Sequence, residues 1–204
     1  MTPALQAVLS RLHARMAAEE RLRATLSPQA FAERRPELML AIGEESGKLL
    51  HLLVLAAGAT RILEIGTSVG YSTLWLADAV RQTGGRVTTL DASADKHRQA
   101  REHLHAAGLL ASVDFVTAQA PACIEALPGP FDAVLLDCER HDYRPCFEAF
   151  APKLAPGALV VADNMTVPPS PHAPAYQAHV RGLPGWDSVL VPIGNGIELS
   201  RKPL

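Results

Sequence analysis

The sequence predicts an α/β fold built on a doubly wound, mostly parallel sheet. Short β-rich runs alternate with helical stretches between residues 61 and 163, an arrangement that is typical of parallel sheets. Several of these runs are almost continuously apolar, which indicates strands that are buried on both faces. Near the end of the chain the alternation stops, and two β-rich runs flank the sequence GNG, which predicts a hairpin.

Two helices are expected before the sheet begins. Apolar side chains recur at helical spacing within the first 25 residues, namely Leu5, Val8, Leu9, Leu12 and Met16. Charges of both signs lie between them, so this helix is expected to cover the core or contact another subunit rather than lie on a membrane. Prolines at positions 28 and 36 break the pattern, and a second helix is expected from Gly43 to about Ala57.

The elements of the sheet follow in order. Strands are expected at 61–66, 86–91, 113–118, 131–137 and 158–163, with helices near 70–82, 94–107, 119–127 and 141–154. The helix after Asp91 shows the signals clearly, because Ser93 can cap it and Gly108 can end it. A last helix near 174–182 precedes the hairpin. With no internal repeat, we expect one domain over residues 1–204, made of an N-terminal helical cap (1–42) and a core (43–204).

Composition excludes several classes of function. The net charge is −2 and 20% of the residues are charged, so no basic field favours a nucleic-acid or anionic-membrane partner. No apolar run is long enough to span a bilayer, and the start of the chain lacks the layout of a secretory signal. The three cysteines form no CxxC pair, which suits free thiols in the cytoplasm.

Ligands of open parallel sheets bind beyond the carboxyl ends of the strands, so the residues there are the first candidates for a site. The first strand ends in LEIGTSVGYST, where Gly66 and Gly70 allow close approach of a ligand. Their GxxxG spacing differs from the GxGxxG of dinucleotide-binding folds, which argues against a dehydrogenase. Asp91 ends the second strand and could accept hydrogen bonds from both hydroxyls of a ribose, or it could simply cap the next helix. Together these residues favour a nucleoside-containing ligand.

The fourth and fifth strands deliver oxygen donors to the same edge. The fourth ends at Asp137, and the fifth ends at Asp163 and Asn164. Two buried carboxylates side by side repel one another unless a cation lies between them. An all-oxygen set suits Mg²⁺ or Ca²⁺ better than Zn²⁺. The alternative is that each aspartate caps the helix or turn that follows it.

At this point the chain resembles a known family. The segments LEIGTSVGYST, LDAS, FDAVLLDCERHDY, PGALVVADN and IGNGIELSRK are similar to those of the cation-dependent, S-adenosylmethionine-dependent O-methyltransferases of the catechol and caffeoyl-CoA type. The resemblance runs from about Gly43 to Arg201. It implies a Rossmann-like class I methyltransferase fold with seven strands, the last of them antiparallel.

The resemblance also implies roles for individual residues. S-adenosyl-L-methionine is expected at a site that includes Glu64, Gly66, Gly70, Tyr71, Ser72, Asp91, Asp137 and Tyr143. Asp91 would contact the ribose, and Tyr143 closes the motif that begins at Asp137. Mg²⁺ or another divalent cation is expected on Asp137, Asp163 and Asn164. The cation would chelate two vicinal oxygens of a phenolic acceptor and lower the pKa of the hydroxyl.

The sequence departs from the family at the expected base. The family has a lysine where this chain has Arg140, and an arginine stays protonated. Three interpretations remain: metal activation with Arg140 steadying the phenolate, His141 as the base, or an unusual acceptor such as an amine or carboxylate. The alternative is that Arg140 is an exposed residue at the start of a helix and that His141 is exposed to solvent, with no catalytic role for either.

Three functions are therefore considered. The first is a metal-assisted O-methyltransferase for a small phenolic acceptor, with Asp137, Arg140 and His141 as candidate catalytic residues. The second is a metal-independent methyltransferase of the same fold, acting on an amine or another small acceptor. The third is a protein that binds S-adenosylmethionine without catalysis. The family and the apolar first helix make a homodimer plausible, and no nucleic-acid or membrane partner is expected.

Overall fold

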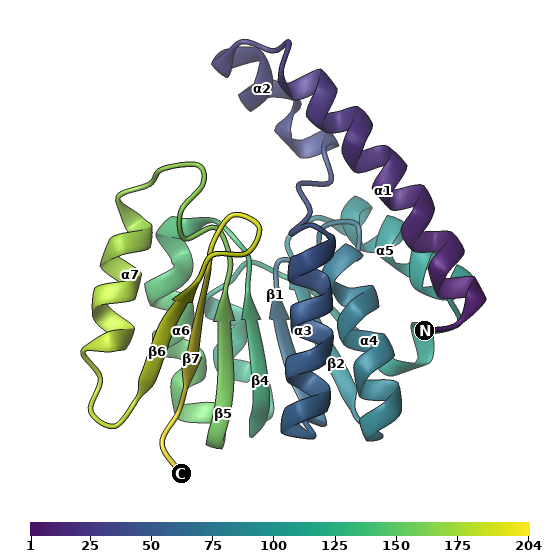
Figure 1. Cartoon of the computed structure of the whole chain (residues 1–204). Coiled ribbons are helices and arrows are strands. Elements are labelled where there is room, and N and C mark those ends of the chain that lie inside the picture. The colour runs from purple at the N-terminus through teal and green to yellow at the C-terminus, as the bar shows by residue number, and fades with distance from the viewer.

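The computed structural model describes residues 1–204 and contains one seven-stranded sheet with helices on both faces (Figure 1). The strands are β1 (Arg61–Ile65), β2 (Arg86–Asp91), β3 (Val113–Thr117), β4 (Phe131–Leu136), β5 (Leu154–Ala162), β6 (Asp187–Val191) and β7 (Ile197–Arg201). Their order is β3-β2-β1-β4-β5-β7-β6. The first five strands pair in parallel, and β7 is antiparallel to both of its neighbours. The predicted fold class is confirmed.

The helices are α1 (Pro3–Arg23), α2 (Pro28–Arg34), α3 (Glu44–Ala57), α4 (Tyr71–Thr83), α5 (Ala94–Ala106), α6 (Tyr143–Phe150) and α7 (His172–Arg181). Short 3₁₀ turns occupy Arg35–Glu37, Leu110–Ser112, Ala122–Ala126, Arg140–Asp142 and Ala151–Lys153. None of the helices is both long and apolar enough to cross a membrane. Helices pack on both faces of the sheet, as is typical of a doubly wound sheet.

Side chains alternate across the strands and give the protein two cores. Ile62 of β1 and Leu135 of β4 face the core that includes α1, α3 and α4. Leu63 and Leu136 are their sequence neighbours and face the opposite core, which includes α6 and α7. This alternation follows from the two-residue period of a strand. It also directs Glu64, which shares a face with Ile62, toward α4.

Three elements differ from the sequence predictions. The helix expected at 119–127 is only the short turn Ala122–Ala126. The helix expected at 141–154 is regular only over α6, since Pro152 cannot continue it. Residues 28–34, which the prolines suggested as a break, form α2, because Ser27 caps the helix and Pro28 takes its first position.

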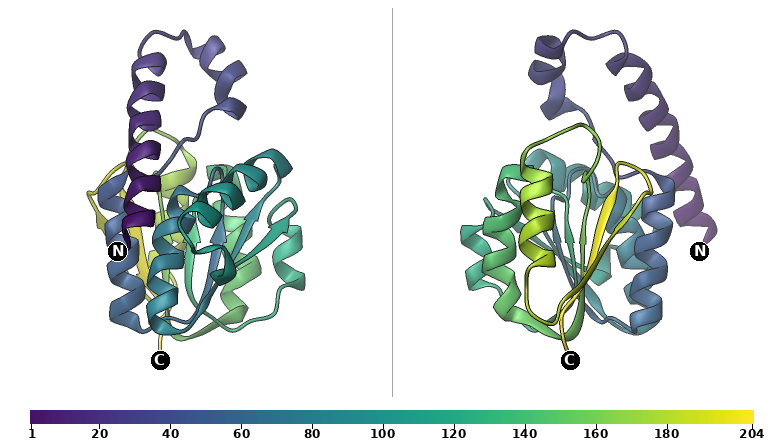
Figure 2. Two further views of the ribbon diagram at one scale, coloured as in Figure 1. Left: turned by 90° about the vertical axis from the view of Figure 1, so that its right-hand side faces the viewer. Right: turned by 60° about the vertical axis from the view of Figure 1, so that its left-hand side comes forward.

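The N-terminal segment forms an arch above one end of the sheet. Figures 1 and 2 show α1 leaning against the core at its N-terminal half, while its other end and α2 project beyond the carboxyl ends of the parallel strands. Leu5, Val8, Leu9 and Leu12 of α1 are buried, whereas α2 buries no residue. The arch thus stands over the edge where ligands of such sheets bind.

Candidate active site

A cavity of about 790 Å³ lies between the carboxyl ends of the strands and the N-terminal arch. Its floor includes Gly66, Asp91, Asp137 and Asn164, which follow or end β1, β2, β4 and β5. In the sheet, β1 lies between β2 and β4, so the order in which strands are added changes from one side of β1 to the other at this point. Such switch points are where doubly wound sheets bind ligands. The sequence prediction of a shared site therefore agrees with the position of these four residues.

The glycine loop after β1 is shaped by close packing. Gly66 has φ +107°, and a Cβ built there would lie 2.0 Å from the carbonyl oxygen of Asp137. Gly70 has φ +84°, and its Cβ would lie 2.9 Å from the Cβ of Ala100. Only glycine fits such positions without strain. Gly66 lines the cavity, while Gly70 begins α4 and packs against α5.

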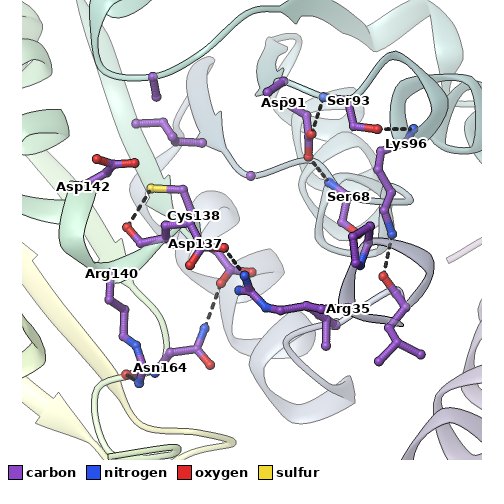
Figure 3. Close-up of a pocket in the computed structure, with 18 of the residues that line it drawn as sticks. Arg35, Ser68, Asp91, Ser93, Lys96, Asp137, Cys138, Arg140, Asp142 and Asn164 are labelled. Atoms are coloured by element: carbon purple, nitrogen blue, oxygen red, sulfur yellow. Dashed lines mark hydrogen bonds and ion pairs between the residues drawn. The ribbon is translucent and has the colours of Figure 1, made fainter. Parts of the chain in front are cut away.

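Asp91 is held by two backbone groups beside the cavity. One carboxylate oxygen accepts a hydrogen bond from the Ser68 N–H and the other from the Ser93 N–H, both at 2.8 Å. The helix cap itself is made by Ser93, whose hydroxyl accepts from the Lys96 N–H. Each oxygen of Asp91 keeps a further lone pair for a ligand. Figure 3 shows this group on one side of the cavity.

Glu64 and Ser72 lie beneath the cavity and do not line it. The Glu64 carboxylate is fully buried and accepts hydrogen bonds from the hydroxyls of Ser72, Thr73 and Thr89 at 2.5–2.6 Å. Burial raises the pKa of Glu64 to about 7, although the three hydroxyls oppose that shift. Because these bonds join β1, β2 and α4, the group fixes the loop from below.

Two other residues assigned to the cofactor also point elsewhere. The Tyr71 hydroxyl is 2.8 Å from Nε2 of His13 on α1. The Tyr143 side chain is buried, and its hydroxyl donates to the backbone oxygen of Asp163 at 3.1 Å. Neither tyrosine lines the cavity. Both side chains therefore brace the elements around the site.

The predicted metal ligands come together at the ends of β4 and β5. The Asn164 amide nitrogen donates to a carboxylate oxygen of Asp137 at 2.8 Å. Asp163 is 2% exposed, and neither of its carboxylate oxygens has a hydrogen-bond partner. Burial raises the pKa of Asp163 to about 7. Burial, followed by the charges of Asp163 and Glu64, raises the pKa of Asp137 well above its ordinary value.

These residues fit a hard divalent cation, with one adjustment. Asp163 is buried and Asp137 is half-buried, and two neighbouring carboxylates that form no ion pair are stabilised by a cation between them. The Asn164 amide turns its nitrogen toward Asp137, while its oxygen accepts from Asn195 at 3.1 Å. An amide oxygen ligand would require a half turn of this group. The structure has no cluster of three His, Cys, Asp or Glu side chains suited to a metal, so water or an acceptor would complete the coordination.

The two other candidate catalytic residues, Arg140 and His141, lie in different surroundings. Arg140 lines the cavity, and its guanidinium donates to the backbone oxygen of Asn164 at 3.2 Å and to that of Pro168. His141 lies outside the cavity lining, and its side chain is 62% exposed. Its Nε2 is 3.5 Å from a carboxylate oxygen of Asp142. The geometry thus brings Arg140, and not His141, to the site.

Several cavity residues were not identified from the sequence. Arg23, Phe31 and Arg35 reach the cavity from the arch. Arg35 forms an ion pair with Glu139, which follows β4 and also lines the cavity. No local motif marks these positions, because they come near the sheet only through the path of the arch.

Comparison with known proteins identifies the family. Residues 63–165 match a family described as a methyltransferase domain. A catechol O-methyltransferase from Niastella koreensis is 35% identical over 130 residues, or 62% of this chain and 58% of that protein. One from Mycobacterium tuberculosis is 38% identical over 128 residues, or 62% of this chain and 57% of that protein. The matched region therefore spans less than two thirds of these relatives.

Solved structures agree with this assignment. The O-methyltransferase TomG from Streptomyces achromogenes, solved in complex with SAM, superposes with a TM-score of 0.77 at 27% identity. The superposition covers 100% of this chain and 91% of that one. The resemblance seen in the sequence motifs is confirmed, and the matched family region covers half of the chain. The chain belongs to the methyltransferase-domain family.

Proposed function

We propose that this chain is an S-adenosylmethionine-dependent O-methyltransferase that acts, with Mg²⁺ or a similar divalent cation, on a small catechol-like or phenolic acceptor. The observation that carries the proposal is the Asp137 carboxyl group on the floor of the cavity together with the buried Asp163 carboxyl group behind it, neither of which forms an ion pair. Two relatives named catechol O-methyltransferase support the acceptor class.

The donor is proposed to bind on the Asp91 side of the cavity. Asp91 is fixed by two backbone N–H groups, and its free lone pairs can accept from both hydroxyls of a ribose. Gly66 lines the same region without a side chain. The SAM complex of the neighbour TomG supports this donor. Glu64 and Ser72 would support the loop through their hydrogen bond rather than by contact.

The acceptor is proposed to bind on the side of Asp137, Asp163 and Asn164. A cation held there would lower the pKa of the acceptor hydroxyl. The acceptor oxygen then attacks the methyl carbon in line with the sulfur. A C–O bond forms, and the C–S bond breaks with its electron pair going to sulfur. The residues of both sides fix the distance and direction of this attack.

Neither Arg140 nor His141 acts as a general base in this mechanism. Arg140 cannot accept a proton, because its guanidinium stays charged at every relevant pH. His141 is exposed to solvent and lies outside the cavity lining. We therefore favour activation of the hydroxyl by the cation, with the hydroxyl proton passing to solvent water rather than to either side chain.

A transfer assay tests the proposal. The protein is incubated with radiolabelled S-adenosylmethionine and a panel of catechols, with and without EDTA. We expect transfer that EDTA abolishes and Mg²⁺ restores. Transfer that EDTA does not affect would instead support a metal-independent methyltransferase, and donor binding without transfer to any acceptor would support a binding protein.

Asp163→Ala gives a more local test. Because Asp163 supplies two unpartnered oxygens, we expect the variant to lose at least about 100-fold in kcat/KM, which is the upper end of the loss caused by removing a group behind a metal ligand. Donor affinity measured by calorimetry should change little. Asp187→Ala, at an exposed position on β6, is the control. Full activity in Asp163→Ala would exclude the metal site.

We also propose that residues 1–42 cap the core, and that the protein acts in the cytoplasm as a homodimer. The buried face of α1 supports the cap. The three free cysteines suit a reducing compartment. Light scattering tests the dimer, since a monomeric mass at micromolar concentration would contradict it.

A further inference from the structure

Arg140 occupies an unusual position at the edge of the cavity. Its guanidinium donates through the same nitrogen, Nη1, to the backbone oxygens of Asn164 and Pro168. It forms no ion pair with a carboxylate, although Glu139 and Asp142 are close in sequence. Figure 3 shows the side chain of Arg140 extending toward Asn164. The positive charge therefore meets carbonyl groups of the segment that follows β5.

The same segment is held from its other side by the turn between β6 and β7. The N–H groups of Thr166 and Val167 donate to the Asn195 backbone oxygen at 2.8 and 3.2 Å. The Met165 N–H donates to the Gly196 oxygen at 2.9 Å. Residues 164–168 thus lie between this turn and Arg140, and they have no helix or strand of their own.

Asn164 also has a backbone conformation that requires support. Its φ is +60°, in the left-handed region that few non-glycine residues occupy and that asparagine adopts more readily than most. Such a conformation persists only where the surroundings enforce it. The bond from Arg140 to the Asn164 carbonyl acts directly on this residue, and the Asn164 side chain is the one that contacts Asp137.

We propose that Arg140 is a positioning residue that holds segment 164–168, and with it the Asn164 side chain, against Asp137. This inference extends the proposed function, since it explains how a chain with arginine in place of the family's lysine keeps its site in order. A guanidinium presents five donors in a rigid plane, and it cannot lose its charge. Those properties suit a permanent link between two carbonyl groups, and they do not suit a proton acceptor.

Hydrogen exchange tests the link without substrate or metal. In Arg140→Met we expect the amides of Met165, Thr166 and Val167 to exchange at least about fivefold faster than in the wild type, since a bond that restrains the segment is lost. Arg144→Met is the matched control, because Arg144 is exposed and pairs only with Glu148. Exchange in Arg140→Met that matches the control within about twofold would overturn the proposal.

Metal binding and conservative rescue give the second readout. Titration of the apo protein with Mg²⁺ alone should show about 10- to 100-fold weaker binding in Arg140→Met, as when a group behind a ligand is removed. Arg140→Lys should recover part of the exchange protection, because an ammonium can still donate to a carbonyl. Protection in Arg140→Lys no better than in Arg140→Met would argue against a hydrogen-bonded link.

The outcomes remain separable from those of the proposed function. If the wild type binds no Mg²⁺ and transfers no methyl group, the proposed function fails, while the exchange data still decide the role of Arg140. If kcat falls in Arg140→Met while hydrogen exchange and Mg²⁺ binding match the wild type, Arg140 acts on the reactants themselves and the positioning role is refuted. Arg140→Gln, which keeps an amide donor, replaces the methionine variant if that variant does not fold.

Discussion

The buried carboxyl group of Glu64 makes stability depend on pH in a way that can be isolated. The pKa of this group is raised from 4.5 to about 7, mainly by burial. A raised pKa in the folded state means that the folded protein holds the proton where the unfolded chain has released it. The contribution to stability is therefore complete below pH 4.5 and is lost as the pH rises to about 7.

The size of the effect follows from the shift. Each unit of pKa difference is worth about 1.36 kcal/mol, so the shift corresponds to roughly 3 kcal/mol in total. Between about pH 5 and about pH 8, the wild type should lose about 2–3 kcal/mol of unfolding free energy through this group. Glu64→Gln keeps the shape and cannot ionise, so it should not share that loss.

Urea unfolding of both proteins at a series of pH values measures the difference. The unfolding free energy of Glu64→Gln minus that of the wild type should rise by about 2–3 kcal/mol across the range. Groups such as Asp163 act on both proteins and largely cancel. A difference that stays flat within about 0.5 kcal/mol would refute the reasoning, and would mean that the three hydroxyl hydrogen bonds offset the burial of the charge.

Two further predictions concern the loops around the donor side. Gly66→Ala should lower the unfolding free energy by at least about 3 kcal/mol, because its Cβ would overlap the Asp137 carbonyl. The control is Gly84→Ala, which has open space around it and should lower the unfolding free energy by only about 1–2 kcal/mol. Equal losses for the two variants in urea unfolding would contradict the steric argument. Asp91→Asn should weaken donor binding about 10-fold or more in calorimetry, since charged acceptors make the stronger hydrogen bonds. The exposed Asp95→Asn is its control, and unchanged affinity in Asp91→Asn would contradict the ribose assignment.

The fold and the edge that carries the site were predictable because they depend on local patterns. Apolar strands end where a polar residue must face a ligand or solvent, and Asp91, Asp137 and Asp163 mark such ends. Parallel strands bring their carboxyl ends to one edge, so proximity follows from topology alone. Asp137 and Asn164 are 27 positions apart in the chain and still share a hydrogen bond.

Side-chain direction and long-range contacts were not predictable from the same patterns. Tyr71 follows the glycine loop, yet its hydroxyl turns to His13, because the first helix packs over that side. Ser72 of α4 turns inward and donates to Glu64, because the alternation along β1 directs the Glu64 side chain toward α4. Arg35 reaches the cavity through the course of the arch, which no spacing in the sequence records.

The turn between β6 and β7 gives the end of the chain a direct influence on the pocket. Asn195 lines the cavity and bonds the Asn164 side chain from 31 positions downstream. Residues 192–196 lie outside both flanking strands, and Gly194 and Gly196 are fixed by positive φ and close contacts, so the other three positions can change without altering the pairing of the sheet. Substitution at these three positions therefore offers a way to reshape acceptor selectivity while the region around Asp91 is left intact.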